Sequence, residues 1–168
     1  MLLHQNLEKY AEMTPDHLFS EFKDIKRTYK EANIDANQMA NSFLIEGLKK
    51  GDRFSFLAKN CYEMAIMYHA ASKVGVVPVP LNYRLANQEW EYIINDSQSK
   101  LIMVCDDEFI SRIDSFKDKL HTVKKFISIK GSKQLFDWLH LSEWSQGVDV
   151  KNLNIDIKED DDVYQMYT

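Results

Sequence analysis

Cysteine, glycine and proline are scarce in this chain, and each scarcity excludes a class of protein. The two cysteines, Cys61 and Cys105, have no metal-ligand spacing. They favour reduced thiols in a cytoplasmic protein, with a single disulfide as the open alternative. The five glycines are isolated from one another, so neither common glycine-rich phosphate loop is present. With only three prolines as well, a long disordered linker is not expected.

Long apolar runs and stripes of positive charge are also missing. The apolar runs are too short to cross a bilayer, and the first residues lack the features of a secretory signal peptide. The net charge is -5, with acidic and basic residues interspersed, so nucleic acid is a poor partner. What remains is a globular composition: 168 residues, 45% apolar and 28% charged, enough to bury a sizeable core. We expect a cytoplasmic protein without a transmembrane segment.

Strand and helix patterns alternate along most of the chain. Segments 18–22 and 25–29 predict a β-hairpin, and Thr28 with Glu31 has the pattern of a capping box for a helix that stops near Gly47. Further strands are predicted at Arg53–Ala58, Val76–Pro80, Leu101–Cys105 and Phe126–Ile129, and further helices from about Asn60 to Val74, at Asn87–Asp96 and at Asp107–Lys119. This alternation is typical of βαβ crossovers. The sequence therefore predicts an α/β fold: a mostly parallel sheet with helices on both faces.

Two parts of the predicted sheet are special. Pro78 and Pro80 cannot donate ladder hydrogen bonds, which favours a sheet margin for their strand. After Gly131 the pattern weakens. There the sequence indicates a short helix around Leu135–Leu139, a polar loop at Asp149–Asp161 and a last strand at Val163–Tyr167.

No complete catalytic constellation is present, and most reactive side chains have a simpler structural explanation. The histidines have no metal spacing, and His69 lies within a predicted helix, where a structural role is favoured. Glu159–Asp162 fits a solvated turn better than a cation site. Packing is favoured over thiol chemistry for Cys61, and a plain turn over phosphate binding for Gly131-Ser132-Lys133. We assign no catalytic residue and no metal ligand to these residues.

Two features do favour a ligand site. Arg84 lies in the loop that follows the predicted strand Val76–Pro80, and ligands of open α/β sheets gather at the carboxyl ends of strands. Its guanidinium can present a planar fork to a phosphate, although a solvated arginine is the simpler alternative. Thr168, at the end of the chain, has a hydroxyl and an amide that would begin any loop that continued.

Four blocks, in order, resemble the adenylate-forming superfamily of acyl-CoA synthetases, peptide-synthetase adenylation domains and luciferases. They are Thr28-Tyr29-Lys30-Glu31, the Gly-Asp and Asn at 51, 52 and 60, the stretch from Lys73 to Asn82 with its Pro-Leu-Asn ending, and Gln165-Met166-Tyr167-Thr168. The last block matches the residues that lead into the family's phosphate loop. The stretch Leu81–Leu85, followed by 91–97, is most similar to fatty or aryl acid–CoA ligases.

The resemblance implies an ATP-dependent acid–CoA ligase that converts a fatty acid, ATP and CoA into acyl-CoA, AMP and pyrophosphate. It implies ATP, Mg²⁺ and CoA for the parent enzyme, Thr168 as the first residue of the ATP phosphate loop, and Arg84 as a contact for the phosphates of CoA. Residues 1–168 would be the N-terminal α/β portion of the AMP-binding domain. The rest of that domain would follow Thr168, so we expect this portion alone to bind none of these ligands and to be inactive.

Two alternatives stay open: a standalone α/β binding module, and a fragment of a peptide-synthetase adenylation domain, in which an Asp is common at the position of Asn82. Codons for Ser-Gly-Thr-Thr-Gly after Thr168 would favour the ligase, and an early natural stop codon would favour the module. A final strand with an open edge would also favour a homo-oligomer.

Overall fold

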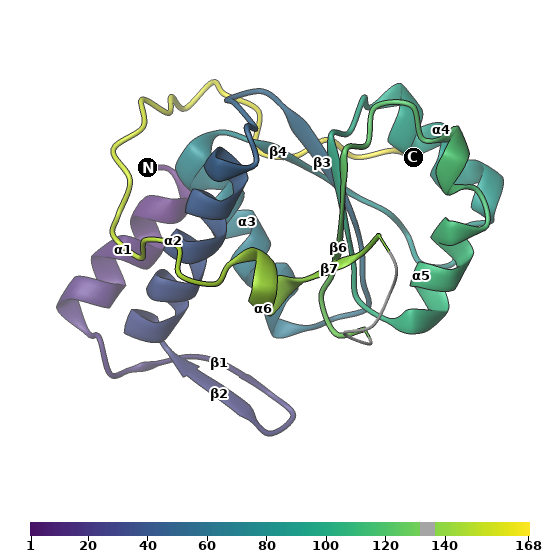
Figure 1. Ribbon diagram of the computed structural model, residues 1–168. Coiled ribbons are helices and arrows are strands. Elements are labelled where there is room, and N and C mark those ends of the chain that lie inside the picture. Colours follow the sequence, from purple (N-terminus) through teal and green to yellow (C-terminus); the bar gives the residue numbers. More distant parts are fainter. Residues whose placement is uncertain (132–136) are drawn as a thin grey trace. The chain divides into compact units, whose positions relative to one another are not determined.

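The computed structural model describes residues 1–131 and 137–168, and in it the chain forms two compact units (Figure 1). The first unit consists of Met1–Gly51, Asn60–Val76 and Gly147–Val163. The second consists of Asp52–Lys59, Val77–Gln146 and Tyr164–Thr168. The chain thus passes from one unit to the other several times.

The first unit is built on helices α1 (Leu3–Met13), α2 (Tyr29–Ile45) and α3 (Tyr62–Val74), which pack on one another. Strands β1 (Leu18–Phe22) and β2 (Ile25–Thr28) form the predicted antiparallel hairpin. The capping box is also confirmed: the Thr28 amide donates to the Glu31 carboxylate at 2.8 Å, and the Glu31 amide donates to the Thr28 hydroxyl at 3.2 Å. Local sequence signals therefore fix both the hairpin and the start of α2.

A row of asparagines on α2 holds the polar loop that ends this unit. Asn33 and Asn37 each donate a side-chain hydrogen bond to the Asn152 amide oxygen, and Asn37 also donates to the Val150 carbonyl at 2.8 Å. One turn further on, Asn41 donates to the carbonyl of Asp149. Residues four apart share a helix face, so α2 offers the irregular loop a line of hydrogen-bond donors.

The second unit contains a parallel five-stranded sheet in the order β4-β3-β5-β6-β7. Its strands are β3 (Arg53–Leu57), β4 (Val77–Pro80), β5 (Leu101–Val104), β6 (Lys125–Ser128) and β7 (Leu139–His140). Its helices are α4 (Asn87–Asp96), α5 (Asp107–Asp114), the 3-10 turn η1 (Lys117–Lys119) and α6 (Leu141–Trp144). The predicted α/β class with a parallel sheet is confirmed, and β4 lies at the sheet margin, as its prolines indicate.

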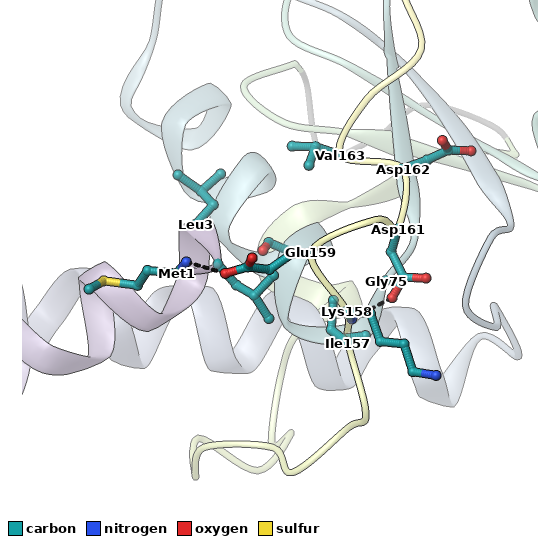
Figure 2. Close-up of a pocket in the computed structure, with 11 residues that line it drawn as sticks. Met1, Leu3, Gly75, Ile157, Lys158, Glu159, Asp161, Asp162 and Val163 are labelled. Carbon is teal, nitrogen blue, oxygen red and sulfur yellow. Dashed lines mark hydrogen bonds and ion pairs between the residues drawn. The ribbon is translucent and has the colours of Figure 1, made fainter.

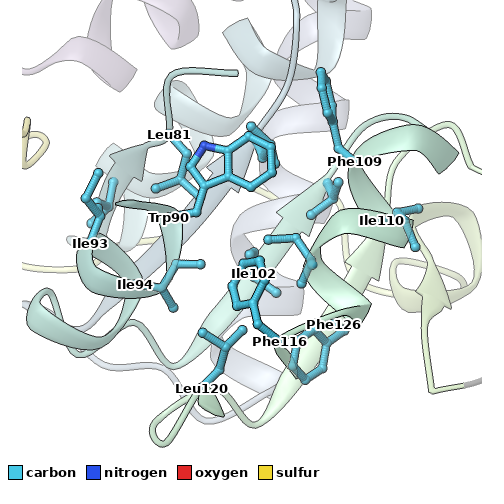
Figure 3. Packing of buried hydrophobic residues seen from close by; sticks show 14 of the residues in the cluster. Leu81, Trp90, Ile93, Ile94, Ile102, Phe109, Ile110, Phe116, Leu120 and Phe126 are labelled. Atoms are coloured by element: carbon cyan, nitrogen blue, oxygen red, sulfur yellow. The ribbon is translucent and has the colours of Figure 1, made fainter. Parts of the chain in front are cut away.

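The core of this unit lies where α4 and α5 pack on the sheet (Figure 3). Ile102 and Val104 of β5 project from one face, because alternate residues of a strand point the same way. They meet Trp90 and Ile94 of α4 and Ile113 of α5, and all five are fully buried. The packing also fixes the loops at the carboxyl ends of the strands.

Two sequence expectations need correction here, and one helix was missed. The helix expected at Asp107–Lys119 stops at Asp114, and only the short turn η1 follows. The Ser115 hydroxyl bonds the Arg112 carbonyl at 2.7 Å, and Phe116 turns into the core. Leu139 belongs to strand β7 rather than to a short helix, and the Leu135 part of that expectation lies outside the described residues, as do Ser132 and Lys133. Helix α1 was not expected at all.

The last strand expected at Val163–Tyr167 is absent, and β4 supplies the reason. The amides of Val77 and Leu81 donate inward to the carbonyls of Asp52 and Phe56, so Pro78 and Pro80 face the outer edge. Neither proline has an N–H, and a neighbouring strand would find no donors there. The segment instead makes a single ladder-like bond, from the Gln165 amide to the Pro78 carbonyl at 3.0 Å.

Within the described residues, no helix combines the length and the apolar character needed to cross a bilayer. Both cysteines are buried, and no disulfide joins them, which excludes the disulfide alternative.

Candidate functional site

The loop Leu81–Leu85, which follows edge strand β4, takes its shape from Asn82. The Asn82 side-chain oxygen accepts from the Arg84 amide at 3.0 Å. Its backbone carbonyl accepts from the Trp90 indole N–H at 2.9 Å and from the Leu85 amide at 3.1 Å. Because Trp90 is fully buried, these bonds tie the loop to the core of the second unit. Arg84 is therefore displayed from a backbone that is already ordered.

Arg112 of α5 fastens the far end of the same loop. It donates to the Leu85 carbonyl at 2.7 Å and to the Asn87 side chain at 2.9 Å, and its guanidinium lies 3.7 Å from the centre of the Trp90 ring. Sequence reasoning missed this residue, since its partners lie 25 and 27 positions away. No local motif marks such a contact.

Two cations flank one aromatic ring at this edge of the sheet. Arg84 is exposed, and its guanidinium lies 5.5 Å from the centre of the Tyr83 ring. The Lys59 ammonium, just after β3, lies 5.9 Å from the same ring and 5.4 Å from that of Phe109. Sequence reasoning also missed Lys59. It follows its strand much as Arg84 follows β4, so the rule for carboxyl ends of parallel strands had the signal to find it.

An apolar pocket of about 490 Å³ adjoins this loop and reaches the end of the chain. It is lined by Asn82, Leu85, Gln88, Glu89, Tyr92, Ile93, Tyr167 and Thr168. The structure therefore brings Thr168 together with the loop that carries Arg84, although 84 positions separate them in the sequence. The Arg84 side chain itself does not line the pocket.

Tyr167 closes one side of the pocket. Its hydroxyl donates to Asp96 at 2.6 Å and accepts from the Gln165 side chain at 2.9 Å. Burial, together with the hydrogen bond to Asp96, raises the pKa of Tyr167 to about 12. The hydroxyl is therefore a protonated hydrogen-bond donor at every physiological pH.

A second pocket, in the first unit, lies beside the acidic run Glu159–Asp162 (Figure 2). Two of its carboxylates are already paired with ammonium groups: Glu159 with the amine of Met1, and Asp161 with Lys50 at 2.6 Å. Among residues 1–131 and 137–168, no group of three or more His, Cys, Asp or Glu side chains is placed to hold a metal ion. The favoured turn interpretation fits these contacts, and the run is given no ligand role.

The fold and the loop define a class: an open α/β protein with cations and an ordered loop at the carboxyl ends of its strands. A comparison with family models is more specific. The model described as "AMP-binding enzyme" matches residues 7–168, and the chain belongs to that family.

Known proteins that resemble the chain agree with this assignment. The long-chain-fatty-acid–CoA ligase FadD13 of Mycobacterium tuberculosis is 39% identical over 80 residues, which cover 48% of this chain and 16% of the relative. A linear gramicidin synthase of Brevibacillus parabrevis is 32% identical over 103 residues, 61% of this chain and 1% of that protein. The match to the crystal structure of the N-terminal domain of FACL13 from M. tuberculosis covers 100% of this chain and 42% of that chain, with a TM-score of 0.85 and 26% identity. The chain thus spans only a small part of the length of the curated relatives it matches.

Proposed function

We propose that this chain is the N-terminal portion, residues 1–168, of an ATP-dependent fatty acid–CoA ligase. The observation that carries the proposal is the pocket that joins Thr168 to the Asn82–Leu85 loop. Family membership and the likeness to FadD13 support the same reaction class. The proposal includes a carboxylic acid, ATP and CoA as substrates. It places the reaction in the cytoplasm, where buried thiols such as Cys61 and Cys105 stay reduced.

The proposed reaction has two steps. A carboxylate oxygen of the acid attacks the α-phosphorus of ATP, and pyrophosphate leaves with the electrons of the broken P–O bond. The CoA thiolate then attacks the acyl carbon, and AMP leaves. Both steps build negative charge on phosphate oxygens, so cations and backbone amides near the phosphates lower the barriers.

Thr168 and Arg84 have separate roles in this proposal. The Thr168 hydroxyl and amide belong to the site for the phosphates of ATP. The exposed guanidinium of Arg84, held over Tyr83, is assigned to the phosphates of the CoA nucleotide. Mg²⁺ would neutralise ATP phosphate charge, but the described residues contain no three-ligand cluster, and we assign no Mg²⁺ ligand within them.

The first prediction separates the two steps. In the proposed full-length ligase, Arg84→Ala should lower the rate of thioester formation by about ten- to a hundredfold, because one charge-assisted phosphate contact of about 1.5–3 kcal/mol is lost. Acid-dependent ATP–pyrophosphate exchange should change less than twofold. Arg84→Lys keeps the charge without the planar fork and should lie between. Equal losses in both assays would contradict a role specific to CoA.

A peptide-synthetase adenylation domain is the second candidate, and the match to linear gramicidin synthase favours it. The two candidates differ in what accepts the acyl group: free CoA, or a carrier-protein thiol. Product analysis with CoA as the only thiol distinguishes them.

The proposal also includes self-association of these 168 residues. The exposed side chains of Tyr164 and Met166, 50% and 61% accessible, support it.

A further inference from the structure

The segment Tyr164–Thr168 is held in the second unit by side chains rather than by a strand ladder. Its single ladder-like bond, from the Gln165 amide to the Pro78 carbonyl, is 3.0 Å long. Since the outer edge of β4 offers only proline nitrogens, a second bond to a β4 donor is impossible. One backbone bond does not by itself set the direction of the segment, so its side-chain contacts also matter.

Those contacts form a continuous relay of side-chain hydrogen bonds. The Arg53 guanidinium, at the start of β3, donates to the Gln165 side-chain oxygen at 2.7 Å. The Gln165 side-chain nitrogen donates to the Tyr167 hydroxyl at 2.9 Å, and that hydroxyl donates to Asp96 at 2.6 Å. Gln165 and Tyr167 are two residues apart, and the bond between their side chains places both on the same side of the segment.

The end of α4 receives this relay. Asp96 is the last residue of that helix, and the Tyr167 ring packs edge-on against Tyr92, one turn earlier, with centroids 6.4 Å apart. The intervening Met166 is 61% exposed, consistent with alternation along the segment. A side chain of β3 thus binds Gln165 at one end of the relay, and side chains of α4 contact Tyr167 at the other end.

We propose that the relay from Arg53 through Gln165 and Tyr167 to Asp96 is a positioning device that orients Thr168 for phosphate binding. The proposal rests on the ATP role given to Thr168 above. Tyr167 is its immediate neighbour, so a rotation of the Tyr167 backbone would move the Thr168 hydroxyl and amide directly. Donors fixed before the ligand arrives stabilise phosphate charge without reorganising, which is the advantage of such an anchor.

The first test uses the 168-residue chain and the exchange rate of the Gln165 amide measured by NMR. Tyr167→Phe removes the hydroxyl and keeps the ring, and we expect the Gln165 amide to exchange about tenfold faster. Asp96→Asn keeps an acceptor oxygen and should have a smaller effect. Tyr62→Phe is the matched control: it removes a 2.7 Å tyrosine–aspartate bond, to Asp35, in the first unit. Equal Gln165 exchange in Tyr167→Phe and the parent chain would overturn the anchor.

The second test measures catalytic function in the proposed full-length ligase. Tyr167→Phe should lower kcat/KM for ATP about tenfold in pyrophosphate exchange, while the KM for CoA stays unchanged. Asp96→Asn should lower kcat/KM for ATP by a smaller factor. Tyr62→Phe should leave kcat/KM for ATP and the KM for CoA unchanged. If Tyr167→Phe acted only through a general loss of stability, Tyr62→Phe would lower activity as well. Normal ATP kinetics in Tyr167→Phe would overturn the positioning role alone. An unsubstituted protein without acid-dependent exchange would overturn the proposed function, and the positioning role with it.

Discussion

At the scale of single residues, Gly75 shows most clearly why one residue type is required. It ends α3 with φ at +70°, in the left-handed region that favours glycine. An added Cβ would lie 2.9 Å from a side-chain carbon of Ile157 and 2.9 Å from one of Lys50, so space is limited as well. Gly47, with φ at +86°, has nothing within 4 Å of the same position.

This contrast gives a second prediction. Gly75→Val should lower the free energy of unfolding by roughly 1–3 kcal/mol, because backbone strain and crowding add. Gly47→Val carries the strain without the crowding and should cost less. Urea unfolding of the two variants beside the parent chain measures both. A Gly75→Val chain as stable as the parent, or more stable than Gly47→Val, would contradict the role given to this glycine.

At the scale of elements, α1 is held to α3 by an ion pair that is buried on one side. The Lys73 ammonium, whose side chain is 0% exposed, donates to the Glu8 carboxylate, which is 23% exposed. Burial lowers the pKa of Lys73, and Glu8 opposes that shift. Beside this pair, the His4 ring lies 2.9 Å from the Ser72 hydroxyl.

The third prediction follows from the imbalance of burial. Glu8→Ala would leave the buried Lys73 ammonium without its carboxylate, and we expect a loss of roughly 2–4 kcal/mol of unfolding free energy. Glu21→Ala is the control, since it removes an exposed pair with Lys26 on the hairpin and should cost less than about 1 kcal/mol. Chemical denaturation measures both. Similar losses in the two variants would show that burial of Lys73 contributes little.

The fourth prediction concerns pH and the same pair of helices. Burial lowers the pKa of His69, on α3, to about 4, with Lys73 and His4 acting in the same direction. The unfolded chain, with a histidine pKa near 6.5, binds this proton more readily than the folded chain does. The contribution of neutral His69 to the free energy of unfolding is therefore complete above pH 6.5 and is lost as the pH falls toward 4.

Between pH 7 and pH 5, the unfolding free energy should fall by about 1–2 kcal/mol from this residue. His4, whose pKa is lowered mainly by burial, adds to the same slope. Denaturation at both pH values, with His69→Gln as the variant that should flatten the slope, is the measurement. An equally steep slope in His69→Gln would assign the pH dependence to other groups.

Elements also show which parts of the fold the sequence could predict. The capping box at Thr28, the end of α3 at Val74 and the marginal position of β4 depend on local chemistry, and all three were predicted. The absence of the last strand was not predicted, because it depends on which edge of β4 the two prolines of that strand face. Helix α5 ends early for a similar reason: Phe116 is drawn into a core that only the tertiary structure defines.

The candidate site likewise contains residues that the local sequence could identify and residues that it could not. A family-like loop after a strand was enough to select Arg84, and a terminal hydroxyl was enough to select Thr168. The pocket that joins Thr168 to the loop carrying Arg84, and the contacts of Arg112 and Tyr167, link residues far apart in the chain, so no short stretch of sequence contains them. Lys59 is the exception, since its place after β3 was visible in the sequence.

At the scale of the whole molecule, the chain contributes an ordered loop and, in our proposal, the approach to a phosphate site. It is an AMP-binding family member whose match to FadD13 covers 16% of that protein. Adenylate formation needs a phosphate cradle, a metal ion and a positioned carboxylate. The described residues supply no metal cluster, and the five glycines of the chain are isolated from one another. The fifth prediction is that these 168 residues alone do not form an acyl-adenylate.

Calorimetric titration with Mg-ATP and a fatty acid, followed by an assay for released pyrophosphate, tests this account most directly. The 168-residue chain should give no saturable heat and no pyrophosphate. The protein at the length of its relatives should release pyrophosphate only when the acid is present. Micromolar binding of Mg-ATP by the 168 residues, or acid-dependent pyrophosphate release from them, would contradict the account. So would a full-length protein that releases none with any fatty acid.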